Sequence, residues 1–160
     1  MKFAMNGALT IGTLDGTNIE IRDAVGAENF FLFGLTANQV RELREGSYDP
    51  RRYYESDSEL RESLDGWIYG EFSGGDTALF RPLYDSLLDR DEYMLLADYR
   101  SYVDCQHSAG QVFLDREKWN RMSVMNIART GRFSSDGAIR EYCKDIWRTG
   151  PIADNEKRAS

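Results

Sequence analysis

Two short stretches near the start of the chain have the apolar pattern of buried β-strands. The first, 8–14, carries β-favouring residues at alternate positions, and Gly7 and Gly12 leave room there for another backbone or a ligand. The second, 30–33, is a compact Phe-Phe-Leu-Phe run followed by glycine, which is typical of a strand buried on both faces. The pattern therefore predicts two strands close together in the sequence.

The segment between these strands carries the signals of a turn and a helix start. Asp15-Gly16 predicts the turn. Thr17 with Glu20 three residues later matches a capping box, which predicts a helix over about 18–25. Strand, glycine turn and capped helix in this order present phosphate-bearing ligands in open α/β sheets. The same order also arises from ordinary sheet packing, so on its own it establishes no function.

Helical patterns fill most of the chain after these strands. The predicted helix caps are Thr36 with Gln39, Ser56 with Glu59, Asp115, and Ser134 or Ser135. Apolar residues recur at helical spacing over 60–64, 79–88, 99–106, 119–127 and 139–147. Pro82 suits the first turn of a helix, whereas Asp49-Pro50 predicts a break and the glycine-rich 70–76 predicts a flexible loop.

The chain thus divides into a strand-helix-strand part at 1–34, a mainly helical part at 35–150 and a polar tail at 151–160. This alternation indicates an α/β class that is strongly helix-rich. Two strands cannot form a stable independent sheet. Their uncovered edges therefore predict poor solubility or self-association.

Composition and charge narrow the classes of function. The apolar share of 41% is that of a globular protein. A net charge of −7 argues against nucleic-acid or anionic-membrane partners, which require a basic face. Cys105 and Cys143 form no Cys-x-x-Cys pair, so we expect two small buried hydrophobes in a reducing cytoplasm rather than a metal or redox site.

The exact amino-acid sequence of the first strand and its turn is more informative about the protein family than its pattern of apolar residues. The run Asn6-Gly7-Ala8-Leu9-Thr10-Ile11-Gly12-Thr13-Leu14-Asp15-Gly16 closely resembles the α-glucan phosphorylases, the glycogen, starch and maltodextrin enzymes. The likeness continues collinearly nearly to Trp147. It passes through Phe31-Leu32-Phe33-Gly34, Ala97-Asp98-Tyr99, Tyr102-Val103, Cys105-Gln106, Trp119, Asn126-Ile127-Ala128 and Phe133-Ser134-Ser135-Asp136.

The resemblance implies a fold and an activity. It implies the C-terminal part of the second Rossmann-like domain of a glycosyltransferase-B fold. The implied enzyme is a cytoplasmic, homodimeric glycosyltransferase that performs reversible phosphorolysis of α-1,4-glucan ends with inorganic phosphate to give glucose 1-phosphate.

The resemblance also implies a cofactor site at Lys2. In the family, the lysine just before the Asn-Gly-Ala run carries pyridoxal 5′-phosphate, and here that lysine is Lys2. It would anchor the cofactor rather than attack sugar. In the family, a glycine-containing segment before this lysine holds the cofactor phosphate, but only Met1 precedes Lys2 here. Met1 can be a true start or an internal methionine. We therefore expect no phosphorolysis from this chain alone, since the N-terminal portion of the parent is missing.

Other candidate residues have no such support. His107 is the only histidine, which excludes a histidine-based metal cluster, and we expect a surface side chain. Ser101, Asp104 and His107 make a triad only on paper. Asp98 and Asp104 are six residues apart on a predicted helix and should not share a face. The acidic surroundings of the basic and aromatic run 51–54 favour a packing or interface role over nucleic-acid stacking.

Three functions remain open at this stage. The chain can be one portion of an active phosphorylase, a non-catalytic interaction or structural module, or a weak binder of pyridoxal phosphate without turnover. The apolar stripe at 139–147 is core by default. In the phosphorylases, however, the final helices cross back onto the N-terminal domain, so part of this stripe would be bare in this chain.

Overall fold

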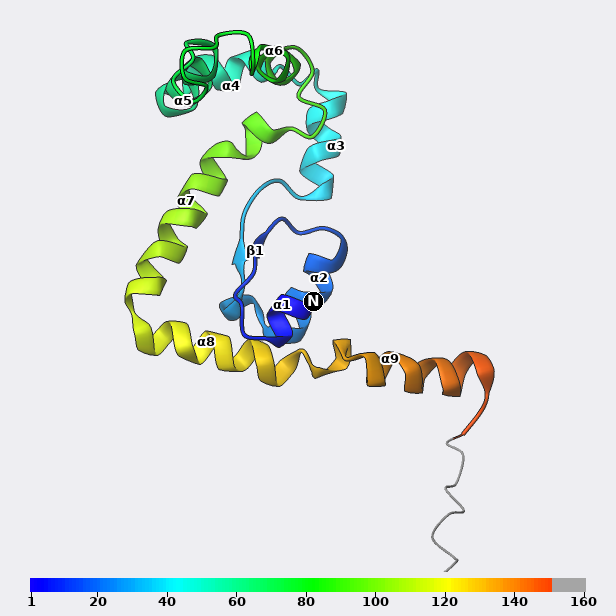
Figure 1. Ribbon diagram of the computed structural model, residues 1–160. Helices are drawn as coiled ribbons and strands as arrows, with labels where there is room; N and C mark the ends of the chain where they lie inside the picture. Colours follow the sequence, from blue (N-terminus) through cyan, green and yellow to red (C-terminus); the bar gives the residue numbers. More distant parts are fainter. Residues whose placement is uncertain (151–160) are drawn as a thin grey trace, which may run out of the picture.

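The computed structural model describes residues 1–150, so the predicted polar tail at 151–160 lies outside the described residues. Figure 1 shows α4, α5 and α6 gathered at one end of the long helix α7, with α1, α2 and β1 near its other end. Helix α8 runs across beneath these N-terminal elements, and α9 extends beyond them. The architecture is therefore helix-rich with a small sheet, as the sequence predicts.

The sheet consists of two parallel strands, β1 (Ile11–Gly12) and β2 (Phe31–Leu32), with Ile11 opposite Phe31. Both strands are shorter than the predicted 8–14 and 30–33. The expectation that the second strand is buried on both faces is wrong, because Leu32 is exposed and Phe31 only half-buried. In the described part of the chain no further strand flanks this pair, so neither strand is covered on both sides.

Helices make up the rest of the ordered elements. The first half contains α1 (Lys2–Met5), α2 (Gly16–Val25), the 3-10 turn η1 (Ala27–Asn29), α3 (Ala37–Glu45), α4 (Pro50–Ser56) and α5 (Ser58–Ile68). The second half contains α6 (Arg81–Asp89), α7 (Leu95–Leu114), α8 (Arg116–Arg129), the 3-10 turn η2 (Gly131–Phe133), α9 (Ser135–Glu141) and the π-helical turn η3 (Tyr142–Trp147).

Two separate apolar clusters hold these elements together. The cluster near the strands consists of Ala4, Ile21, Val25 and Phe30, with Phe133 against it. The cluster at the far end of α7 is built on Leu60, Leu64, Leu88 and Leu96, with Tyr53, Tyr54, Trp67, Tyr84, Leu87 and Tyr99 packed around it. The first cluster joins α1 and α2 to the segment before β2, and the second joins α4, α5, α6 and α7.

Helix caps confirm part of the sequence prediction. Thr36 and Gln39 form the predicted capping box at the start of α3. Asp115 accepts from the backbone N–H of Lys118 at the start of α8, and Ser134 caps α9. In each case a side-chain oxygen satisfies a backbone donor that the helix itself leaves unpaired.

Other predicted helix starts are wrong by one or two residues. The helix predicted to begin after Thr17 begins at Gly16, so Thr17 lies inside its first turn and makes no capping box with Glu20. Asp57, not Ser56, caps α5, because its carboxylate accepts from the backbone N–H groups of Glu59 and Leu60.

Asp49-Pro50 also behaves differently from the predicted break. Asp49 caps α4 by accepting from the N–H of Arg51, and Pro50 is the first helical residue. Proline is favourable there because its missing N–H would have no partner within the helix. Pro82 occupies the first turn of α6, as predicted. The flexibility of 70–76 remains a prediction.

The cap of α5 can be tested by substitution. Asp57→Ala removes the carboxylate that accepts from the backbone N–H groups of Glu59 and Leu60, and it also removes the ion pair with Arg100, at 2.6 Å. We expect the free energy of unfolding in urea to fall by about 1–2 kcal/mol, mostly from the lost cap.

Ser56→Ala is the matched control for this substitution. The Ser56 hydroxyl donates only to the Tyr53 carbonyl at the end of α4, at 3.2 Å. Its loss should change stability by less than about 0.5 kcal/mol. Equal losses for the two variants would contradict the assignment of Asp57 as the cap.

Candidate functional site

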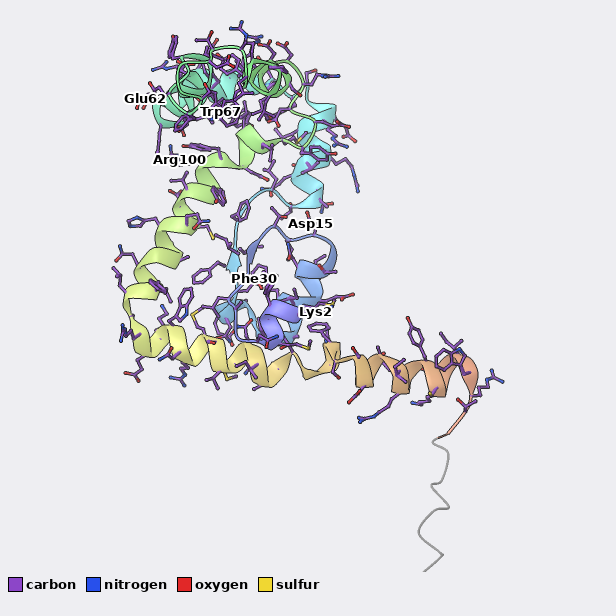
Figure 2. All side chains as sticks on the ribbon, in the orientation of Figure 1. Lys2, Asp15, Phe30, Glu62, Trp67 and Arg100 are labelled. Carbon is purple, nitrogen blue, oxygen red and sulfur yellow. The ribbon has the colours of Figure 1, made fainter. Side chains whose placement is uncertain are left out.

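Lys2, the predicted cofactor residue, is the first residue of the four-residue helix α1 (Figure 2). Ala4 is buried in the cluster near the strands, whereas Lys2 is exposed. Successive helical residues turn by about 100°, so residues two apart point to nearly opposite sides. Burial of Ala4 therefore orients the helix with the Lys2 side chain toward solvent.

The turn after α1 is fixed to α8 by a close contact. Gly7 has a φ of 83°, which favours glycine, and its carbonyl accepts from the hydroxyl of Ser123 at 2.7 Å. A Cβ on Gly7 would lie 2.5 Å from the same Ser123 oxygen. Gly12 similarly gives room to the side-chain amide of Asn18. In both places the close approach comes from the chain's own side chains.

The surroundings of Lys2 fit pyridoxal phosphate only in part. The amine is the group that an aldehyde requires, and its exposure leaves it accessible. Five hollows on the surface of residues 1–150 are lined by residues other than Lys2. The described residues thus offer an accessible amine at Lys2, and none of these hollows encloses it.

The start of α2 does not favour an anion. Asp15 occupies the position before the helix, and its carboxylate accepts from the Thr13 hydroxyl at 3.0 Å rather than from a helix N–H. A carboxylate at a helix N-terminus occupies the electrostatic position that a phosphate would take. The strand-turn-helix order is therefore present, but its turn carries negative charge.

A hollow of about 510 Å³ opens at the carboxyl ends of the two strands. We call it the aromatic–acidic hollow; its lining residues are Thr13, Asp15, Phe33, Tyr93, Leu95, Asp98, Tyr99 and Tyr102. Asp98 accepts from the backbone N–H of Leu35 at 2.7 Å, which ties α7 to the end of β2. Burial raises the pKa of the Asp98 carboxyl, and the negative charges of Asp91 and Asp15 raise it further, against the Leu35 hydrogen bond.

Ser101, Asp104 and His107 do not form a catalytic triad in the structure. Ser101 accepts from the backbone N–H of Gly34 at 2.9 Å, and no hydrogen bond joins Ser101, Asp104 or His107 to one another in the described residues. His107 is exposed, as predicted. Asp98 and Asp104 line different hollows, which confirms that they do not share a face.

The remaining candidate chemistry is structural. Tyr53 and Tyr54 pack against the leucine cluster, which confirms a packing role for the aromatic part of 51–54. Cys105 is buried, as expected, and burial raises its thiol pKa, whereas Cys143 is only half-buried. Among residues 1–150 no cluster of potential metal ligands occurs, and no helix is long and apolar enough to span a membrane.

Comparison with known proteins agrees with the resemblance in the first strand and its turn. The family model described as carbohydrate phosphorylase matches residues 1–149. The chain belongs to the carbohydrate phosphorylase family.

Three relatives show the extent of this likeness. The chain is 57% identical to a glycogen phosphorylase of Synechocystis sp. over 95% of its own length and 18% of the relative's. Its identity is 47% to the Bacillus subtilis glycogen phosphorylase, over 95% of this chain and 19% of that protein. Its identity is 42% to the liver form of glycogen phosphorylase from Bos taurus, over 94% of this chain and 18% of that protein. The chain thus spans less than a fifth of the length of these relatives.

One residue of this phosphorylase-family chain has a role that its sequence did not indicate. Asp91 is buried and accepts from the Tyr48 hydroxyl and from the backbone N–H groups of Leu95 and Leu96. It lies in a charged stretch that has the composition of a surface loop. Only its position four residues before the start of α7 could have indicated a cap.

The raised pKa of Asp98 predicts how stability depends on pH. A carboxyl whose folded pKa is raised costs stability while it is charged, and that cost disappears as the pH falls through the folded pKa. Asp98→Asn keeps an oxygen for the Leu35 N–H and removes the charge. We therefore expect the variant to unfold at higher urea concentration than the parent at pH 7, with the difference shrinking as the pH is lowered.

Asp104→Asn provides the control, because Asp104 is an exposed aspartate on the same helix. It should leave the urea midpoint nearly unchanged at pH 7. A clear loss of stability in Asp98→Asn at neutral pH would show that the charged Asp98 stabilises the fold.

Proposed function

We propose that this chain works as part of an α-glucan phosphorylase and carries the lysine, Lys2, to which pyridoxal 5′-phosphate attaches. The reaction is reversible phosphorolysis of α-1,4-glucan ends by inorganic phosphate to glucose 1-phosphate. The observation that carries the proposal is the identity of 57% to a glycogen phosphorylase over 95% of the chain. When bound, the cofactor supplies a phosphate group that takes part in proton transfer.

The residues around Lys2 support an anchoring role. Ala4 docks α1 into the cluster near the strands, and the Ser123–Gly7 hydrogen bond fixes the turn that follows. The backbone of Lys2 is held as well, because its carbonyl accepts from the Asn6 side chain at 2.8 Å. The backbone of Lys2 is therefore fixed in position, while the amine at the end of its side chain stays accessible.

Catalysis requires groups outside this chain. The described residues near Lys2 provide no enclosure for cofactor or sugar, and the carboxylate of Asp15 opposes an anion at the helix start of α2. Phosphoryl chemistry depends on preorganised positive charge and hydrogen-bond donors. We therefore propose that the chain alone is inactive and that activity belongs to a longer cytoplasmic, homodimeric protein.

The end of the described chain supports the same conclusion. Ile139, Tyr142, Ile146 and Trp147 lie on α9 and η3, and all four are exposed. The default assignment of this stripe to the core of this chain is wrong. We propose that another part of a glycosyltransferase-B enzyme covers it, with β1 and β2 belonging to the sheet of its second Rossmann-like domain.

A second candidate function is a non-catalytic folded module derived from a phosphorylase. The two apolar clusters, each built wholly from this chain, favour independent folding. The module would keep Lys2 exposed without using it. Chemical labelling of lysine separates the two candidates.

Lys2 can be tested by reductive labelling. The chain is incubated with pyridoxal phosphate and reduced with borohydride, and the adduct is mapped by peptide mass spectrometry. We expect the label on the Lys2 side chain. It should be lost in Lys2→Arg and retained in Lys118→Arg, which replaces an exposed lysine on α8. Fragmentation must separate Lys2 from the α-amine of Met1, which can also react with an aldehyde.

Complementation then tests the activity of the whole. Adding the N-terminal portion of a related phosphorylase to the labelled chain should produce glucose 1-phosphate release, and Lys2→Arg should abolish it. Absence of a Lys2 label in the chain and in the complemented protein would leave the non-catalytic module.

The uncovered stripe predicts self-association of the isolated chain. Ile146→Asp should lower the weight-average mass in sedimentation at high protein concentration, because it places a charge on the exposed apolar face. Val124→Asp, at a position 61% exposed on α8 against 62% for Ile146, controls for added charge. Equal effects of both variants would contradict a role for the α9 face.

A further inference from the structure

The aromatic–acidic hollow has a place in the fold that favours ligands. Thr13 and Asp15 follow β1, and Phe33 follows β2, so both strands direct their carboxyl ends toward it. Ligands of open parallel sheets bind at this edge. Residues of α7 complete the wall, and hydrogen bonds from Leu35 and Gly34 to α7 side chains hold that helix against the end of β2.

The charge of the hollow is unbalanced. Asp15 and Asp98 both line it, and no lysine, arginine or histidine of residues 1–150 does. Thr13 donates to Asp15 and Leu35 donates to Asp98, but neither carboxylate has an ion-pair partner in this part of the chain. The raised pKa of the Asp98 carboxyl is a consequence of the same burial and crowding of negative charge.

The rest of the lining is aromatic and apolar. The rings of Phe33 and Tyr102 meet edge to face, with centroids 5.1 Å apart. Tyr99 already has the guanidinium of Arg100 over its ring at 5.6 Å. Aromatic faces attract cations through their quadrupole, most strongly arginine and ammonium groups. Rings beside two carboxylates therefore make a site whose chemistry matches a cation.

The rim of the hollow distinguishes the kind of cation. Tyr93 is 78% exposed and Leu95 is 54% exposed, and Asp15 is exposed as well, so these three lining residues lie on the solvent side of the hollow. Apolar surface at the mouth suits the alkyl stem of an arginine or lysine, which lies along such surface while its charged end reaches a polar partner. A sugar would leave both carboxylates without compensating charge.

We propose that the aromatic–acidic hollow binds a basic side chain, arginine or lysine, of another polypeptide segment. The charged end lies between Asp15 and Asp98, and the stem lies against Tyr93 and Leu95. The contact is independent of the cofactor assignment, because it involves neither Lys2 nor any step of phosphorolysis. Labelling at Lys2 can therefore succeed or fail without affecting this proposal.

A pair of matched probes tests the charge requirement. Nα-acetyl-arginine amide is titrated into the 15N-labelled chain, in parallel with Nα-acetyl-citrulline amide, a neutral molecule of nearly the same shape. We expect saturable chemical-shift changes at the backbone amides of the lining residues with the arginine probe. The citrulline probe should bind at least about tenfold more weakly, as expected for a loss of charge pairing and cation–π attraction.

Variants then assign the site. The double variant Asp15→Asn with Asp98→Asn should weaken arginine-probe binding at least about tenfold, and Tyr102→Leu should weaken it with both charges retained. Asp104→Asn removes one charge from the same helix outside the hollow and should leave binding unchanged. The amide spectrum of each variant shows whether it is folded.

Three results would overturn the proposal. The arginine and citrulline probes could bind equally, the shifts could map outside the lining residues, or Asp104→Asn could weaken binding as much as the double variant. Maltotriose serves as a further probe. Shifts of the lining residues with maltotriose, without any with the arginine probe, would identify a sugar site instead.

Discussion

The buried carboxylate of Asp91 is the constraint on which the arrangement of α7 depends. It is 3% exposed and accepts from the Tyr48 hydroxyl at 2.6 Å and from the N–H groups of Leu95 and Leu96 at 2.8 Å. Burying a carboxylate is costly unless hydrogen bonds replace its water. The chain therefore has to bring Tyr48 and the start of α7 together. Burial, and then the bond to Asp91, raise the pKa of the Tyr48 phenol, so Tyr48 stays a donor at neutral pH.

With its start fixed, α7 connects the two halves of the molecule. Leu96 belongs to the leucine cluster at one end, while Asp98 and Ser101 accept from the backbone after β2. Figure 2 shows Trp67 and Arg100 at the cluster end and Lys2 and Phe30 at the strand end. The two clusters share no buried residue. Polar contacts of α7 with the end of β2 thus set the position of the strands relative to the leucine cluster, and they form the aromatic–acidic hollow as they do so.

Short sequence patterns predicted which helices form better than they predicted the residues at which those helices begin. Thr36 and Asp115 cap the helices that the sequence assigned to them, and of the two adjacent serines that the sequence offered for α9, Ser134 is the cap. At 56–57 two capping residues are adjacent, and the sequence pattern favoured Ser56. Asp57 caps the helix instead, and its carboxylate also binds Arg100, 43 positions away. The hydrogen bond to Arg100 is the largest cause of the lowered pKa of Asp57. A capping rule that considers only three or four neighbouring residues cannot predict this bond.

The candidate site shows the same limit more sharply. The resemblance could identify Lys2, but the solvent-facing orientation of Lys2 follows from the burial of Ala4 among residues far along the chain. The hollow depends on the bond between Leu35 and Asp98, 63 positions apart, and on a glycine turn at Gly34. The stripe on α9 and η3 has the pattern of a buried face and is nevertheless exposed. Apolar periodicity reports that a face is to be covered, whereas what covers it is determined by other parts of the assembly, in the same or another chain.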